Sequence, residues 1–262
     1  MIPEHRRAEI SIAVQRVYKE AGLDPETINP GVVPLYDLIR AYPIRVAEVK
    51  DMTAQSVAEF LEAETGQALP MPENEDRKLA GYLYLQEYQG LFYGCILVEK
   101  KPQSAPVSRR RFSAAHELGH YLLHFLPLLE RHQKDNSGDA LVLTEGLYVQ
   151  KKSEADDESE EDSNEPTAQL TFTSGVQAVI DALAINQQQM EDEADQFAAE
   201  LLMPASACQA LAKRYRRRFG TKRDVLARRL ATEFLVSKEA MKRRLWDLKL
   251  PEKGACSAFE KP

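Results

Sequence analysis

The 262-residue chain has few cysteines and no long apolar run. Its three cysteines, Cys95, Cys208 and Cys256, are odd in number and lack paired spacing, which argues against a disulfide framework or a thiolate zinc site. The first seven residues lack the apolar core of a signal peptide, and no later stretch reaches the length of a membrane-spanning helix. We therefore expect a cytoplasmic protein with reduced thiols and no membrane partner.

Charge is distributed unevenly along the chain. The net charge is −7, yet residues 213–249 carry fourteen Lys and Arg against four Asp and Glu, a local balance of +10. The remainder is therefore at −17 (−7 minus 10). Such polarity is typical of a basic face that binds an anionic partner, or of self-association between the two halves of a protein.

One stretch is strongly acidic. Residues 153–165 hold eight carboxylates and no large apolar side chain. A stretch of this kind cannot bury apolar surface and repels itself, so we expect an exposed, disordered insertion over about 151–166. A calcium-binding loop is the alternative, but the glycine and the ligand spacing of such loops are missing.

The strongest chemical motif is H-E-x-x-H, formed by His116, Glu117 and His120. Residues four apart on a helix lie one turn along the same face, so both imidazoles can reach one metal ion. Glu117 is rotated about 100° from His116, which suits a base acting on a water molecule at the metal. The alternative is a helix with capping or surface histidines. The flanking residues, however, have apolar helical spacing, which predicts a buried helix.

A catalytic zinc ion normally has three protein ligands, so a third ligand is required. The metzincin pattern is excluded because Leu123 and Leu126 occupy the positions of its glycine and its third histidine. His124 lies a full turn beyond His120, about 6 Å along the axis of an unbroken helix. We expect His124 to pack or to form a hydrogen bond, and metal binding is its less favoured role.

An acidic helix expected at 189–203 offers better ligands. On a helical wheel Glu191 and Asp195 lie at the edge of its apolar stripe, whereas Glu193 and Glu200 point further from it. Because Glu191 and Asp195 are four residues apart, one can bind the metal while the other accepts a hydrogen bond from a ligand histidine. We predict Glu191 as the third ligand, with Glu193 as its main rival. The alternative is an ordinary acidic helix start, which the helix dipole favours.

Two segments, 110–124 and 191–204, resemble the metal-site motifs of the ImmA/IrrE family of zinc metallopeptidases. Residues 234–245 are similar to the C-terminal helical pattern of that family, so the resemblance frames residues 34–248. The chain departs from the pattern in one respect. About seventy residues separate the two motifs, more than in relatives, and the acidic insertion accounts for part of the excess.

The resemblance implies a zinc ion bound by His116, His120 and Glu191, with Glu117 as the catalytic base of a zinc metalloendopeptidase. It also implies that the protein substrate is a helix-turn-helix transcriptional repressor, cleaved during stress or induction of a mobile element. Two other functions stay open. One is a DNA-binding regulator that uses the basic C-terminal helices, although DNA is not the favoured partner. The other is a zinc-dependent toxin of a toxin–antitoxin pair, which differs mainly in what is cut.

The apolar periodicity predicts an α+β fold, with a small sheet packed on the H-E-x-x-H helix and a helical C-terminal part. The resemblance makes this fold a minimal thermolysin-like metallopeptidase. We expect a metallopeptidase domain over 1–204, a basic, helix-turn-helix-like region over 205–250 and a loose tail over 251–262. Helices are predicted at 8–21, 34–42, 53–65, 175–184, 189–203, 205–218, 222–234 and 237–248, and strands at 43–49, 80–87, 91–100, 140–150 and 169–173.

Overall fold

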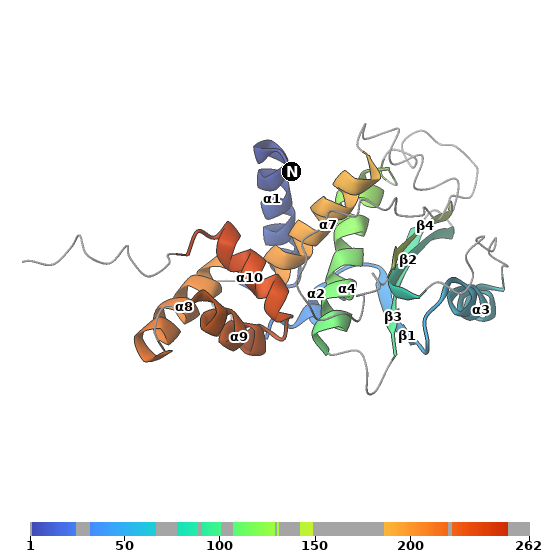
Figure 1. Cartoon of the computed structure of the whole chain (residues 1–262). Helices are drawn as coiled ribbons and strands as arrows, with labels where there is room; N and C mark the ends of the chain where they lie inside the picture. The colour runs from blue at the N-terminus through green and yellow to red at the C-terminus, as the bar shows by residue number, and fades with distance from the viewer. Residues whose placement is uncertain are drawn as a thin grey trace, which may run out of the picture.

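The computed structural model describes residues 2–24, 32–66, 78–88, 91–100, 107–128, 130, 142–148, 186–219 and 222–250. The predicted acidic insertion, strand 169–173, helix 175–184 and C-terminal tail lie outside these residues. The described part has an α+β fold (Figure 1). Its helices are α1 (Glu4–Glu20), α2 (Leu35–Ile39), α3 (Ala54–Thr65), α4 (Val107–His120), the π-helix η1 (Tyr121–Phe125), α7 (Gln187–Leu202), α8 (Ala205–Phe219), α9 (Arg223–Phe234) and α10 (Lys238–Asp247), and its strands are β1 (Ile44–Val49), β2 (Leu79–Tyr88), β3 (Leu91–Glu99) and β4 (Val142–Tyr148).

Four strands form one mixed sheet in the order β1-β3-β2-β4. Strands β2 and β3 make the predicted antiparallel hairpin, in which Tyr88 pairs with Leu91 and Gly81 pairs with Val98. Strand β1 runs parallel to β3, and β4 runs antiparallel to β2. This order places β2 in the interior of the sheet, where it packs against α4.

The central strands bury side chains on both faces of the sheet. Leu83 and Leu85 of β2 belong to the main apolar cluster, which also contains residues of α4 and α7. Tyr82 and Tyr84 alternate with them and belong to a second cluster with α3. Figure 1 shows α3 on one side of the sheet and α4 on the other. The sheet is thus the middle one of three layers, whereas the sequence predicted only the layer formed by α4.

Helix α1 begins at Glu4, four residues before the predicted start at Ala8, so that prediction was wrong. The first turn of α1 has polar side chains, so apolar periodicity did not reveal it. One of these side chains, Arg6, donates a hydrogen bond to the carboxylate of Glu193 on α7. A second contact joins the two helices in the protein interior. Tyr18 is buried, and its hydroxyl donates a hydrogen bond to a backbone oxygen of α7 at 2.6 Å. Helix α1 is therefore docked on the helix that carries the predicted third ligand.

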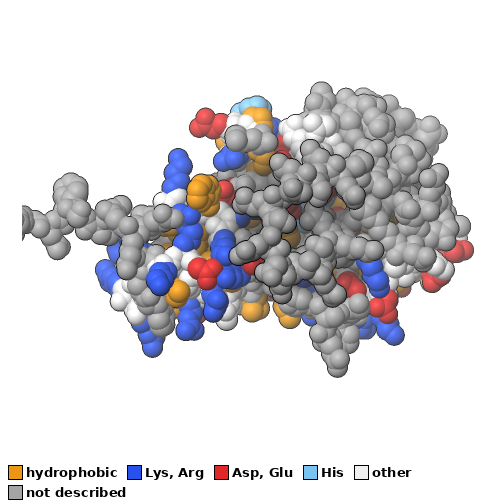
Figure 2. Space-filling model, viewed as in Figure 1, with side chains coloured by type: hydrophobic (Ala, Val, Ile, Leu, Met, Phe, Trp, Pro, Cys, Tyr) orange, Lys and Arg blue, Asp and Glu red, His pale blue; other side chains and the backbone are white. Residues whose placement is uncertain are grey.

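Helices α8, α9 and α10 form the predicted helical C-terminal part. Leu235 ends α9 in the left-handed conformation, with φ at 50°, and the side chain of Ser237 caps α10 by accepting a hydrogen bond from the Ala240 amide. Lys and Arg side chains gather over these helices (Figure 2). Their apolar residues join the same core cluster as α4, so the predicted boundary at residue 204 stays a prediction. None of the helices in the described part has the length and apolarity needed to span a membrane.

Candidate active site

Helix α4 brings the two histidines of the H-E-x-x-H motif together. His116 and His120 are each 1% exposed, and their Nε2 atoms lie 2.9 Å apart. Helical spacing places both rings on one face, as the sequence predicted. Ala114, Ala115 and Leu118 face the core and bury the helix around the histidines. The two imidazoles therefore point their Nε2 atoms at the same place in the protein interior.

Glu191 of α7 faces the two histidines. Its Oε2 atom lies 3.3 Å from His116 Nε2, and its Oε1 atom lies 3.7 Å from His120 Nε2. One ligand atom from each of the three residues lies within 4.8 Å of the others. Two imidazoles and a carboxylate are the donor set of many catalytic zinc sites. The structure thus brings the three predicted ligands together, and a metal ion fits the chemistry of their atoms.

Asp195 lies one turn after Glu191 and contacts His116 from the other side of the ring. Its Oδ1 atom is 2.9 Å from His116 Nδ1, the contact predicted for one member of this carboxylate pair. Burial lowers the pKa of His116, but hydrogen bonds to Asp195 and Glu191 outweigh burial and hold that pKa well above its ordinary value. Burial and the neighbouring His116 hold the pKa of His120 well below its ordinary value. The carboxylates that favour a proton on His116 also favour a cation beside it.

Glu117 has the position and the chemistry of a base. It is fully buried, and neither carboxylate oxygen has a hydrogen-bond partner among the described residues. Burial raises the pKa of Glu117 to about 8, which brings its proton affinity near that of a general base or acid at neutral pH. A bare buried carboxylate is costly, and a water molecule bound next to it would supply the missing partner. The buried Glu117 carboxylate without a partner among the described residues is thus a second observation that fits a metal site.

Two glycines allow the elements of the site to approach closely, and the sequence analysis predicted the role of neither. A Cβ atom at Gly81 of β2 would lie 2.5 Å from Glu117 Oε1. A Cβ atom at Gly119 of α4 would lie 3.0 Å from the Phe197 ring and 3.2 Å from the Ala194 Cα of α7. An isolated glycine inside an apolar helix, such as Gly119, is a recognisable sign of close packing. Gly81 carries no such sign in the sequence.

Glu193, the rival ligand, lies elsewhere. It was expected to point away from the apolar stripe of its helix, but this prediction was wrong, because Glu193 is 0% exposed. The carboxylate faces His124 Nε2 at 3.3 Å and is bound by Arg6 of α1 and by Gln189. Burial opposes its ionisation, but hydrogen bonds from His124, Arg6 and Gln189 outweigh burial and lower the pKa of Glu193 to about 2. A helical wheel of α7 alone does not show that two other helices cover this residue.

His124 is reached through a change of helix type. Residues Tyr121–Phe125 form a π-helix, and the Leu126 amide donates to Tyr121 O, five residues back. The wider turn leaves His124 buried, with its Nδ1 atom 3.1 Å from His120 Nδ1. His124 thus contacts a predicted ligand, as expected for a residue that packs and forms hydrogen bonds. The distance of about 6 Å along the axis of an unbroken helix therefore does not apply across this π-helix.

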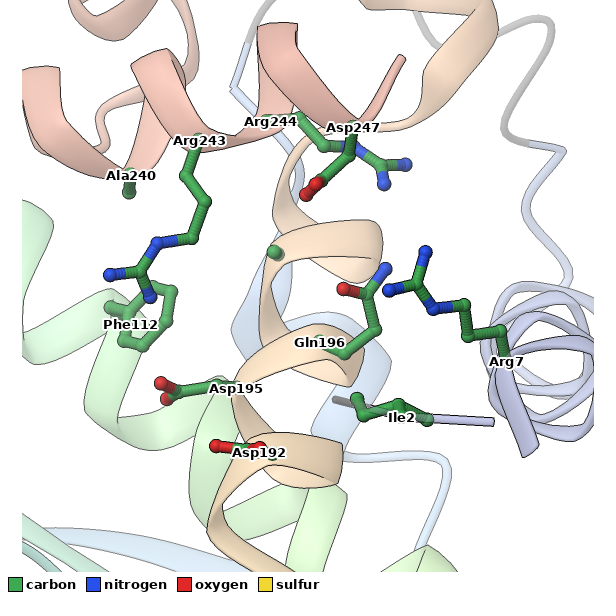
Figure 3. A pocket seen from close by; sticks show the side chains of 11 residues that line it. Ile2, Arg7, Phe112, Asp192, Asp195, Gln196, Ala240, Arg243, Arg244 and Asp247 are labelled. Atoms are coloured by element: carbon green, nitrogen blue, oxygen red, sulfur yellow. The ribbon is translucent and has the colours of Figure 1, made fainter. Parts of the chain in front are cut away.

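A cavity of about 210 Å³ opens between α1, α4, α7 and α10 (Figure 3). Asp195 lies in its wall together with Phe112, which is one turn before His116 on α4. Arg7 reaches the cavity from α1, and Arg243 reaches it from α10 (Figure 3). Because Asp195 both lines the cavity and contacts His116, the cavity lies next to the predicted metal site.

Comparison with known proteins supports the same site from outside the H-E-x-x-H helix. Residues 175–246 match a family model, Peptidase_M78, which is described as an IrrE N-terminal-like domain. The match includes α7 with Glu191 and Asp195 but not α4, so the two motifs are separate observations. No curated protein matches the chain. The match over these residues supports the resemblance of the chain to the ImmA/IrrE family of metallopeptidases, and both motifs converge in the fold.

Proposed function

We propose that this metallopeptidase is a zinc-dependent endopeptidase, with His116, His120 and Glu191 as the protein ligands of the metal. The observation that carries the proposal is the approach of three ligand atoms to within 4.8 Å of one another, from two helices that are far apart in the sequence. The donor set of two imidazoles and one carboxylate supports zinc, since it matches that of several zinc peptidases. Asp195 keeps the Nε2 atom of His116 directed at the metal.

His116, His120 and Glu191 would hold the zinc ion, which would lower the pKa of a water molecule and polarise a peptide carbonyl. Glu117 takes the proton of the attacking water and then gives it to the nitrogen of the leaving amine. Its burial beside the three predicted ligands, with no hydrogen-bond partner for either carboxylate oxygen among the described residues, supports this role.

Glu117→Gln tests this assignment. The variant keeps the size of the side chain, so the fold and the affinity for zinc should be unchanged. Peptide hydrolysis should fall by about 10²–10⁴-fold, the usual contribution of a general base. Metal content by mass spectrometry and cleavage rate on the same preparation give both readings. Undiminished cleavage by Glu117→Gln would remove Glu117 from the proposed role.

The substrate that we propose is a helix-turn-helix transcriptional repressor in the cytoplasm, whose cleavage releases genes under stress or on induction of a mobile element. The resemblance to the ImmA/IrrE family, which the match over residues 175–246 strengthens, supports this substrate. The test is to find whether a helix-turn-helix repressor is encoded beside this chain, to mix it with the zinc-loaded protein, and to look for one discrete cut by mass spectrometry. The Glu117→Gln protein is the matched control. Persistence of the intact repressor with the wild-type protein would contradict the proposed substrate.

The structure offers less support for DNA binding by the C-terminal helices. Lys238 and Lys242 of α10 lie 2.7 and 3.0 Å from Asp224 of α9, so part of the positive charge is used within the protein. Arg244 is buried and donates to the Met203 backbone oxygen at 3.0 Å. Two of the basic residues of α10 are thus paired with an acid, and a third holds α10 against the end of α7.

A further inference from the structure

A chain of buried polar contacts connects His120 with the N-terminal helix. His120 Nδ1 lies 3.1 Å from His124 Nδ1, and His124 Nε2 lies 3.3 Å from Glu193 Oε2. Arg6 Nε donates to Glu193 Oε1 at 3.0 Å, and Arg6 Nη2 contacts Glu193 Oε2. Gln189 Nε2 also donates to Glu193 Oε1, at 2.9 Å. We call His124, Glu193 and Arg6 the support chain.

The contact between the two Nδ1 atoms requires one ring to donate and the other to accept. One of the two rings must carry its proton on Nδ1 while the other accepts. His120 directs Nε2 towards His116 and Glu191, at 2.9 and 3.7 Å. If Nε2 of His120 binds a metal ion, the proton of that ring is on Nδ1. His124 then accepts at Nδ1, carries its own proton on Nε2 and donates it to Glu193.

The support chain buries polar groups that an apolar core would not contain. His124 and Glu193 are both 0% exposed. A buried carboxylate destabilises a fold unless charged or polar partners surround it, and apolar residues of the same volume often stabilise as well or better. Here the partners of Glu193 come from α1, α4 with its π-helical extension, and α7. Such a satisfied network holds each of its members in one orientation.

We propose that His124 and Glu193 are positioning residues that hold His120 in the tautomer and orientation that zinc binding requires, and that Arg6 of α1 anchors them. This inference rests on the zinc site of the proposed function. His116 has a matching support, since Asp195 contacts its Nδ1 atom directly. Each ligand histidine therefore has its own carboxylate, and that of His120 acts through a second imidazole.

The zinc affinity of the full chain, measured without substrate by competition with a chromophoric chelator, tests the support chain. Glu193→Gln and His124→Leu should each weaken zinc binding by about 10–100-fold, the usual effect of losing the hydrogen-bond partner of a ligand histidine. His124→Asn should recover part of that loss, because its amide oxygen can accept the bond from His120. Arg6→Gln should cause a smaller loss, since Gln189 still donates to Glu193.

Tyr18→Phe is the matched control. It removes a different buried hydrogen bond between α1 and α7, that from the Tyr18 hydroxyl to Leu201 O, and leaves the support chain intact. The control should bind zinc with wild-type affinity. After substitution with Co²⁺, the visible absorption of the metal should change in Glu193→Gln and not in Tyr18→Phe, which separates a change at the metal from a loss of stability.

The outcomes are distinct. Wild-type affinity and an unchanged Co²⁺ spectrum in Glu193→Gln would overturn the positioning role. If the variants at the two buried positions do not fold, Arg6→Gln decides the same question, because Arg6 is partly exposed. A wild-type chain that binds no zinc would overturn the zinc site of the proposed function, and this result differs from a failure confined to the variants.

Discussion

The carboxylate of Glu117 packs directly against Gly81, a glycine of strand β2. Gly81 is buried in β2, and a methyl group there would lie 2.5 Å from Glu117 Oε1 and 3.2 Å from its Cγ atom. Real Cβ atoms do not approach other atoms this closely, so either the carboxylate or the strand must move. The position of the Glu117 carboxylate therefore depends on the missing side chain at Gly81 as well as on helix α4.

Gly81→Ala should lower peptidase activity by more than about 10-fold, because small displacements of a catalytic group have large effects on rate. Zinc affinity should remain close to that of the wild type, since the three predicted ligands do not contact Gly81. The matched control is Gly94→Ala in β3, where the added atom would meet the side chains of Leu85 and Ile44 and not Glu117. Full activity in a folded Gly81→Ala protein would contradict the positioning of Glu117 by β2.

The sequence predicted those residues of the site whose relative positions are set within a single helix. His116, Glu117 and His120 follow from spacing within α4, and Glu191 with Asp195 follows from spacing within α7. The structure brings these residues together as the spacing requires, because a helix fixes the relative directions of its own side chains. Their catalytic and metal-binding roles stay predictions.

The burial of Glu193 could not be predicted in the same way. It depends on Arg6, which is 187 residues away in the sequence, and on a π-turn that the residue pattern did not reveal.

At the scale of helices, the site depends on the contact between α4 and α7. Gly119 of α4 lies against the backbone of Ala194 and the ring of Phe197, so the two helices approach without an intervening side chain. Glu191 lies one turn before Ala194 on α7. The distance between the helices therefore also determines the distance from Glu191 to the histidines.

Gly119→Ala should destabilise the protein by about 1–3 kcal/mol, the usual cost of inserting a methyl group into a packed core. It should also weaken zinc binding, because α7 must move away and carry Glu191 with it. Thermal unfolding and chelator competition measure the two effects. Arg109→Ala, on the exposed side of the same helix, should change neither quantity. A stabilised Gly119→Ala protein with unchanged zinc affinity would contradict this account.

Secondary structure followed the sequence closely where apolar periodicity is strong. The hairpin of β2 and β3 and the helices α3, α9 and α10 were predicted within a few residues. The layer formed by α3 on the other face of the sheet was not predicted. Apolar alternation shows that a strand is buried, but the identity of the covering element depends on the path of the chain in space.

In the molecule as a whole, the buried acid at the site links stability to pH. The pKa of Glu117 is about 8 in the folded protein, against an ordinary value of 4.5. Between these pH values the folded state keeps a proton that the unfolded state has lost. The folded state thus binds more protons, and the free energy of unfolding falls as pH rises through this window. The raised pKa of His116 acts in the same direction above pH 6.5.

The lowered pKa values of His120 and His124 act in the opposite direction below pH 6.5. The contribution of Glu117 to the stability of the metal-free wild-type protein should nevertheless decline between pH 5 and pH 8. Glu117→Gln, which stays neutral, should lose part of this decline and be more stable than the wild type at pH 8. Each unit of pKa difference corresponds to about 1.4 kcal/mol. Differential scanning calorimetry of both chelator-treated proteins between pH 5 and pH 8 gives the comparison. Parallel curves for the two proteins would show that Glu117 is not the source of the decline.

The residues of the site are far apart in the sequence, so they are synthesised at different times. His116 and Asp195 are 79 residues apart, and Arg6 and Glu193 are 187 apart. Ribosomes add about 5–20 residues per second from the N-terminus, so α4 precedes the end of the site by roughly 4–16 s. During that time the nascent chain carries the base and two imidazoles without the carboxylates of α7. The three predicted metal ligands therefore cannot meet until α7 has been made.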